Sequence, residues 1–135
     1  QGRILDGTPL PDAVAAIDDG VDQPPLGYMV NCAHPAFLDA PGGTGHSMSP
    51  RLIGFQANAS SLDHTQLEAA AVHQADDLED WGRRMAALNA VHGIKILGGC
   101  CGTGVEHLRC IVRQREILLA HHANADSRIN GHGAG

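Results

Sequence analysis

The sequence predicts an α/β fold with parallel strands, and three observations support this class. Short, mostly apolar runs alternate with longer segments in which apolar residues recur at helical spacing. Polar or sulfur-bearing residues follow the apolar runs directly. The length of 135 residues suits one ordinary domain. Because apolar strands that alternate with amphipathic helices form right-handed crossovers, we expect a parallel sheet covered by helices.

The first elements are a helix and a strand. Apolar residues at helical spacing predict a helix over 10–20. Thr8 and Pro9 before it are typical of an N-cap and of the first helical position. The apolar, uncharged run at 26–31 fits a buried strand. The glycine- and proline-rich segment 39–50 is predicted to be a loop.

A second strand and a second clear helix follow. The apolar run at 52–57 predicts the strand, and a helical segment is expected near Thr65 after a polar loop. A stronger helix begins at Asp76 or Asp77, and Gly93 is placed to end it. The apolar stripe that this helix buries consists of Leu78, Trp81, Met85 and Leu88.

The last elements are a strand, a helix and a tail. The run at 94–98 predicts the third strand. Thr103 and Glu106 have the spacing of a capping box that opens a helix through Leu119. The polar, glycine-rich segment 123–135 is predicted to be a flexible tail.

This alternation of strands and helices is typical of a (β/α)₈ barrel. The chain has about half of the ~250 residues that a complete barrel needs. Three parallel strands leave both outer edges of a sheet unpaired and parts of its apolar surface uncovered. We therefore expect the isolated chain to associate with another chain rather than to remain a monodisperse monomer.

Composition favours a folded domain and argues against two kinds of partner. The chain has 43% hydrophobic and 18% charged residues, which is typical of a packed domain. Its net charge of -6 opposes binding to nucleic-acid phosphates. No run approaches the roughly 20 apolar residues of a membrane span, and the N-terminus lacks the apolar core of a signal peptide. With only four aromatic residues, the core is expected to be aliphatic and alanine-rich.

The chemistry-bearing residues lie directly after the predicted strands. Asn31 and Cys32 follow the first strand, Asn58 follows the second, and Cys100 and Cys101 follow the third. The carboxyl ends of parallel strands meet at one edge, so these side chains could converge there. Three thiolates suit Zn²⁺, whose catalytic sites keep a fourth position open. The glycines around the cysteine pair would let both of its side chains face one metal ion.

Other interpretations of the cysteines remain open. The adjacent pair could form a strained vicinal disulfide, act as a redox dithiol or consist of two core thiols, and Cys32 could also be a core residue. Cys110 lies in a predicted helix and is expected to be a core residue. His34 is expected to cap a turn or to lie behind a metal ligand. The cysteines lack the density of a disulfide framework, which favours a reducing compartment and the cytoplasm.

Two motifs give the chain a specific resemblance. The segment Gly-Gly-Cys-Cys-Gly-Thr at 98–103 resembles the signature of the homocysteine S-methyltransferase family. Tyr-Met-Val-Asn-Cys at 28–32 resembles the upstream strand end of the same family, and segments 6–10 and 52–58 fall where its members carry similar sequences. The resemblance covers about residues 4–120, in order.

The resemblance implies a zinc-dependent enzyme that methylates homocysteine to methionine. The metal ligands would be Cys32, Cys100 and Cys101, and the sulfur of homocysteine would take the fourth position. Asn31 would orient a ligand, and Asn58 would line the substrate pocket. The implied methyl donor is S-methylmethionine or S-adenosylmethionine.

The resemblance also implies an architecture. Residues 1–122 would form the C-terminal half of a (β/α)₈ barrel, followed by the tail. The implied partner is a second copy of the chain or an N-terminal half-barrel. The alternative function is that of a truncated, catalytically inactive zinc-binding fragment of the same family.

Overall fold

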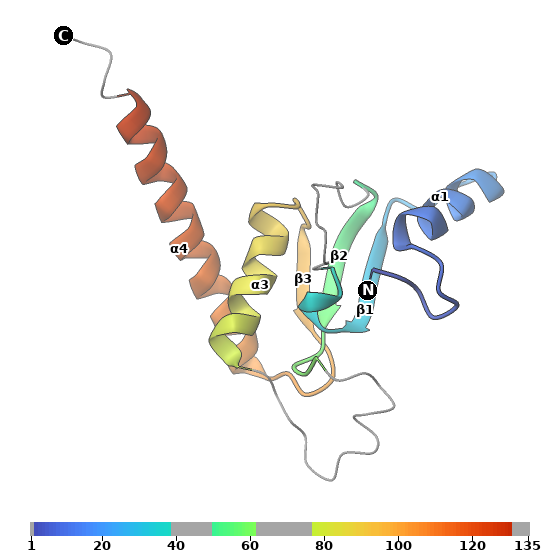
Figure 1. The fold of residues 1–135 in the computed structure, drawn as a ribbon, viewed down its shortest axis with the longest axis horizontal. Coiled ribbons are helices and arrows are strands. Elements are labelled where there is room, and N and C mark those ends of the chain that lie inside the picture. Colours follow the sequence, from blue (N-terminus) through green and yellow to red (C-terminus); the bar gives the residue numbers. More distant parts are fainter. Residues whose placement is uncertain (1, 39–49, 62–76, 131–135) are drawn as a thin grey trace.

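Three parallel strands form the sheet at the centre of the computed structural model (Figure 1). Their order in the sheet is the order in the sequence. The strands are β1 (Tyr28–Ala33), β2 (Leu52–Ala57) and β3 (Ile96–Gly99). The predicted α/β class with parallel strands is therefore confirmed.

The structure describes residues 2–38, 50–61 and 77–130, and the side chains only as far as residue 125. The loop predicted for 39–50 lies outside the described residues except for Pro50, and the helix expected near Thr65 lies outside them altogether.

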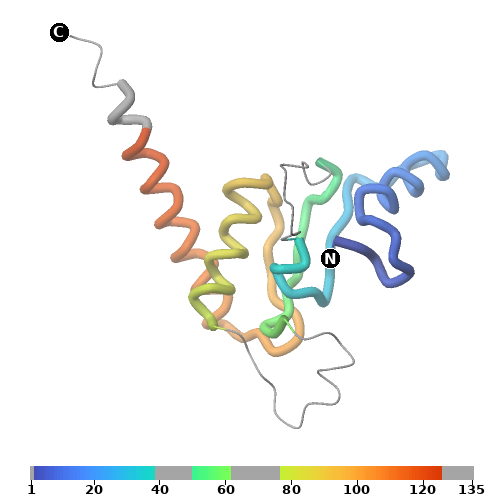
Figure 2. Tube along the Cα trace, in the orientation of Figure 1, coloured from blue at the N-terminus to red at the C-terminus, as the bar shows by residue number. Residues whose placement is uncertain are grey.

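The helices lie on two sides of the sheet. Helices α3 and α4 pack against each other on one side, whereas α1 stands by β1 on the other (Figures 1 and 2). A short 3-10 helix, η1, follows β1 directly. The helices are α1 (Leu10–Gly20), η1 (Pro35–Phe37), α3 (Leu78–Ala90) and α4 (Val105–Asn130).

Two details of the N-terminal prediction are wrong by one or a few residues. The N-cap of α1 is Pro9 and not Thr8, and no side chain caps this helix. Asp6 accepts a hydrogen bond from the Thr8 N–H (2.9 Å), so the turn is closed before the helix begins. The first strand begins at Tyr28 rather than at residue 26, and it continues to Ala33 rather than ending at residue 31.

The start and end of α4 also differ from the prediction. The Thr103 hydroxyl donates to the Cys100 carbonyl (2.8 Å), and the described residues show no hydrogen bond of the predicted capping box between Thr103 and Glu106. Instead, His107 Nδ1 accepts from the N–H of Gly104, the residue before the helix (3.1 Å). The helix continues to Asn130, so the segment from 123 starts as helix.

The core joins β2 to the inner faces of α3 and α4. Its two largest fully buried side chains are Trp81 and Phe55, so the mostly aliphatic core is built around two aromatic rings. Aliphatic side chains surround these two rings, and Met85 and Leu88 of the stripe predicted on α3 are among the apolar residues of the core. The core cluster consists of Leu52, Phe55, Ala57, Trp81, Met85, Leu88, Ile94 and Ile111.

A glycine and a cysteine bring α3 and α4 together. A Cβ on Gly82 would lie 2.3 Å from Cys110 Sγ, so only glycine allows this approach. Cys110 is 1% exposed and its thiol donates to the Leu78 carbonyl (3.4 Å). Its predicted role as a core residue is confirmed.

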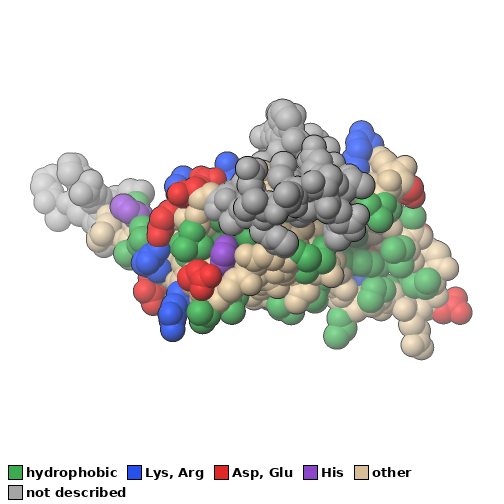
Figure 3. Space-filling view, turned by 90° about the horizontal axis from the view of Figure 1, so that it is seen from below, with side chains coloured by type: hydrophobic (Ala, Val, Ile, Leu, Met, Phe, Trp, Pro, Cys, Tyr) green, Lys and Arg blue, Asp and Glu red, His purple; other side chains and the backbone are tan. Residues whose placement is uncertain are grey.

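The described surface has an uneven distribution of charge. Seen from below, most charged side chains gather at the α3–α4 side, and hydrophobic side chains are more prominent toward α1 (Figure 3). Among the described residues, no helix combines the length and the apolar character needed to span a membrane.

Candidate metal centre

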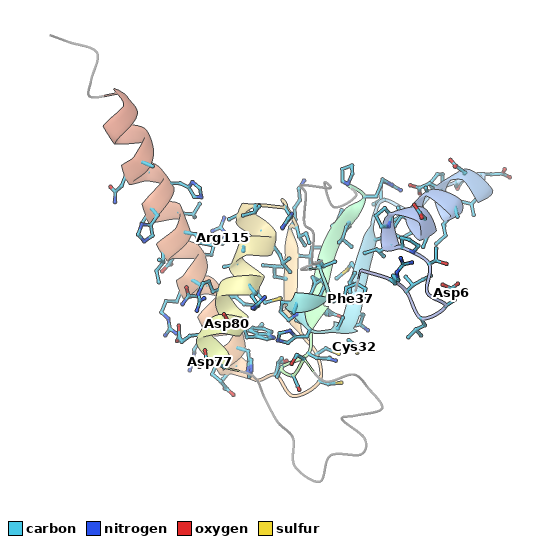
Figure 4. All side chains as sticks on the ribbon, viewed as in Figure 1. Asp6, Cys32, Phe37, Asp77, Asp80 and Arg115 are labelled. Carbon is cyan, nitrogen blue, oxygen red and sulfur yellow. The ribbon has the colours of Figure 1, made fainter. Side chains whose placement is uncertain are left out.

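Cys32 is placed by an irregularity at the end of β1. Asn31 pairs with Gln56 and Ala33 pairs with Ala57, so Cys32 is an extra residue between two consecutive pairs. Its φ of 53° lies in the left-handed region, which costs a residue other than glycine roughly 1–2 kcal/mol. Such a bulge redirects a side chain. Figure 4 shows Cys32 at the carboxyl end of β1.

Cys100 and Cys101 follow β3 at the same edge of the sheet. Of the glycines around the pair, only Gly102 has a positive φ (75°). Gly99 serves another purpose, because a Cβ there would lie 2.1 Å from the hydroxyl oxygen of Thr103. Near the Cys100–Cys101 pair, the backbone therefore needs the conformational freedom of glycine only at Gly102, directly after the pair. On β1, the residue with a left-handed backbone is Cys32 itself.

The three sulfur atoms converge. One ligand atom from each of Cys32, Cys100 and Cys101 lies within 4.8 Å of the others. Cys32 Sγ is 2.7 Å from Cys100 Sγ, and Cys100 Sγ is 4.0 Å from Cys101 Sγ. All cysteines are free thiols, so the vicinal disulfide considered from the sequence is not formed.

This donor set fits a zinc ion. Tetrahedral Zn–S bonds of about 2.3 Å place two sulfurs about 3.8 Å apart. The separation of Cys100 and Cys101 already matches that value. Cys32 and Cys100 would have to move apart by about 1 Å to share an ion of this size. Three thiolates also leave one position of a tetrahedral ion open.

The pKa values of the two closest thiols, Cys32 and Cys100, are shifted in opposite directions. The hydrogen bond with Cys100 raises the pKa of Cys32 to about 12, and burial adds to the effect. The same hydrogen bond lowers the pKa of Cys100 from its ordinary value, because the Cys32 thiol stabilises its thiolate. Cys100 is therefore the sulfur that ionises more readily, and a metal would have to displace the Cys32 proton.

The two asparagines differ in what they contact. The Asn58 side-chain amide donates to the Cys32 carbonyl (3.0 Å), and its Oδ1 is buried with no hydrogen-bond partner among the described residues. Asn31 is exposed on β1 and makes no side-chain hydrogen bond within the described part of the chain. Of the two asparagines, only Asn58 therefore contacts the backbone of a cysteine through its side chain. The roles expected of Asn31 and Asn58 toward a ligand and a substrate stay predictions.

A cavity of about 680 Å³ adjoins Cys32 on the β1 side. Asn31, Cys32 and Asn58 all contribute to its wall, as do apolar residues of the N-terminal segment and of η1. His34 caps η1, because its Nδ1 accepts from the Ala36 N–H (3.2 Å), which is one of the two roles expected for it. The cavity is large enough for a small amino-acid ligand.

Trp81 is a site residue that the sequence prediction assigned only to the core. Its indole N–H donates to the Asn58 carbonyl (2.7 Å), which connects α3 to the loop beside the cysteines. A buried tryptophan usually has a hydrogen-bond acceptor for its indole N–H. This requirement is the feature of the sequence that could have indicated a polar contact at Trp81. The partner itself depends on the tertiary fold and cannot be read from spacing.

These features define a class: a parallel α/β protein with three thiols gathered at the carboxyl ends of its strands, in a group suited to a soft metal ion. The sequence model of the homocysteine S-methyltransferase family matches residues 1–115. The chain therefore belongs to this family, and the resemblance inferred from its two cysteine motifs is confirmed. Comparisons with curated proteins and with solved structures returned no match.

Proposed function

We propose that this chain provides the zinc centre of a methyltransferase that converts homocysteine to methionine with a sulfonium donor. The observation that carries the proposal is the convergence of Cys32, Cys100 and Cys101 within 4.8 Å in a member of this family. Zinc, when bound by these residues, would supply a site that holds the homocysteine sulfur as a thiolate at neutral pH.

The reaction needs a thiolate, a methyl group and an aligned leaving group. The homocysteine thiolate attacks the methyl carbon of S-methylmethionine or S-adenosylmethionine. A new S–CH₃ bond forms as the donor's bond to that methyl breaks, and its electron pair stays on the donor sulfur, which becomes a neutral thioether. The protein has to hold the reactants in line, and it forms no covalent bond itself.

The cavity beside Cys32 is the proposed substrate pocket. Asn31 and Asn58 are the polar groups proposed to contact the substrate there. The Oδ1 atom of Asn58 is available as an acceptor, since only its amide nitrogen contacts Cys32. The apolar wall contributed by Leu10 and Phe37 would exclude water from the reacting atoms.

We also propose a barrel architecture and a reducing cellular compartment for this site. The sheet would be part of a (β/α)₈ barrel, with its outer edges paired by a second copy of the chain or by an N-terminal half-barrel. Three free thiols kept for a metal suit a reducing compartment such as the cytoplasm.

The function is tested by methionine formation. The zinc-loaded chain is incubated with homocysteine and either donor, alone and with the N-terminal half-barrel of a family member. We expect methionine in at least one mixture and none with Cys101→Ser, while Cys110→Ser retains the activity. Zinc binding without methionine in any mixture would overturn the enzymatic proposal and favour the inactive zinc-binding fragment.

A further inference from the structure

Three consecutive residues at the end of β2 contact the backbones of all three cysteines. The Cys100 N–H donates to the Ala57 carbonyl (2.7 Å), and the Ala59 N–H donates to the Cys101 carbonyl (3.0 Å). The Asn58 side chain donates to the Cys32 carbonyl (3.0 Å). Segment 57–59 therefore lies between the two strands that carry the cysteines and connects them.

The contact to Cys32 differs from the other two. It is made by a side chain rather than by the backbone, so it depends on the identity of residue 58. It also reaches the one cysteine whose backbone is left-handed. A strained conformation persists only where its surroundings hold it in place, and the Asn58 amide is the side-chain group that the structure places on the Cys32 backbone.

Asn58 is in turn held by α3. The Trp81 indole N–H donates to the Asn58 carbonyl, and both residues are almost completely buried, at 1% and 3% exposure. The indole is itself fixed by the ring of His107, which meets it edge-on at a centroid distance of 4.9 Å. The Asn58 N–H donates to the Ala33 carbonyl (2.9 Å), so the Asn58 backbone is also hydrogen-bonded to the residue after Cys32.

We propose that Trp81 and Asn58 are positioning residues that hold Cys32 in the geometry needed to complete the three-sulfur group. This inference rests on the proposed zinc function, but it concerns residues that contact neither the metal nor the substrate sulfur. Trp81 fixes the Asn58 backbone, and Asn58 then fixes the left-handed Cys32. Without them, Cys32 would lose the restraint that keeps its Sγ 2.7 Å from Cys100.

The test uses two conservative variants and one matched control. Trp81→Phe keeps an aromatic ring in the core and removes the indole donor together with part of the ring volume. Asn58→Leu keeps the approximate size and removes the amide. The control is Met85→Leu, a fully buried change on the same helix that leaves the indole donor and the Asn58 amide in place. Thermal melts of the metal-free chains identify the variants that fold. If Asn58→Leu does not fold, the result for Trp81→Phe decides the test.

The first readout is metal binding. We expect zinc affinity, measured by chelator competition, to fall roughly 10–100-fold in both variants. With Co²⁺, the thiolate-to-metal charge-transfer band of the variants should weaken as one sulfur is lost, and Met85→Leu should match the wild type. Unchanged affinity and an unchanged Co²⁺ spectrum in Trp81→Phe would overturn the positioning role while leaving the zinc function intact.

The second readout needs no metal, so it separates this inference from the proposed function. Diamide oxidises two nearby thiols to a disulfide and is itself reduced to the hydrazine. Peptide mapping should show rapid formation of a Cys32–Cys100 disulfide in the wild type and in Met85→Leu, and slower formation in both variants. Equal rates would overturn the positioning role even if the wild type bound no zinc.

Discussion

Helices α1 and α3 are both amphipathic, yet they are attached to the sheet in different ways. Helix α3 buries Trp81, Gly82, Met85, Ala86 and Leu88, whereas α1 buries only Val14. Ile17, which the helical periodicity of α1 directs inward, is 46% exposed. Periodicity predicts which face of a helix is apolar, but it does not show whether that face has a partner.

The strands beneath these helices show the same difference. Four residues of β2 are buried, while β1 has none that is fully buried. Helix α1 is held by polar contacts, because Asp18 accepts hydrogen bonds from Arg51 (2.8 Å) and from the Tyr28 hydroxyl (2.9 Å). Cys32 lies on this less buried strand, which explains why its position depends on contacts from β2 and α3.

The largest predicted effect separates the two helices directly. Trp81→Ala should lower the free energy of unfolding by about 3–5 kcal/mol, because it removes the largest fully buried side chain. Ile17→Ala on α1 should change it by no more than about 0.5 kcal/mol. Urea denaturation of the metal-free, reduced chains measures both. Equal losses in the two variants would contradict the proposed difference between the helices.

A second prediction tests the contact between α3 and α4. Gly82→Ala should cost about 1–3 kcal/mol, because its Cβ would overlap Cys110 Sγ. Combining it with Cys110→Ala removes that sulfur, so the double variant should be less destabilised than the sum of the two single changes. A double-mutant cycle measures this coupling. Simple additivity would show that the helices adjust without strain.

The smallest predicted effect concerns the polar attachment of α1. The hydrogen bonds from Arg51 lower the pKa of Asp18 from its ordinary 3.8. A carboxyl with a lowered folded-state pKa stabilises the fold above its unfolded-state value, and this stabilisation is lost as the pH falls through the folded-state value. Asp18→Asn should therefore be slightly less stable than the wild type at neutral pH.

The same pair of chains provides the control. The difference in unfolding free energy should disappear well below pH 3.8, where the wild-type carboxyl is also neutral. It should also decrease in high salt, since the pair is partly exposed. A difference that persists at low pH would mean that Asp18 acts through packing rather than charge.

The sequence predicted the strands well, but not the geometry that completes the site. Apolar runs gave β2 its observed bounds and located β3 and the stripe on α3, because local patterns determine these features. The convergence of three cysteines followed from the rule that parallel strands end at one edge. The left-handed Cys32 and the Trp81–Asn58 contact depend on packing between distant segments, which no local pattern encodes.

The central claim is that Cys32, Cys100 and Cys101 form one zinc site, and zinc content per purified chain tests it most directly. Elemental analysis should find about one zinc ion per wild-type chain, a similar content in Cys110→Ser, and almost none in Cys100→Ser. A wild-type chain without zinc, or a Cys100→Ser chain that retains it, would contradict the claim.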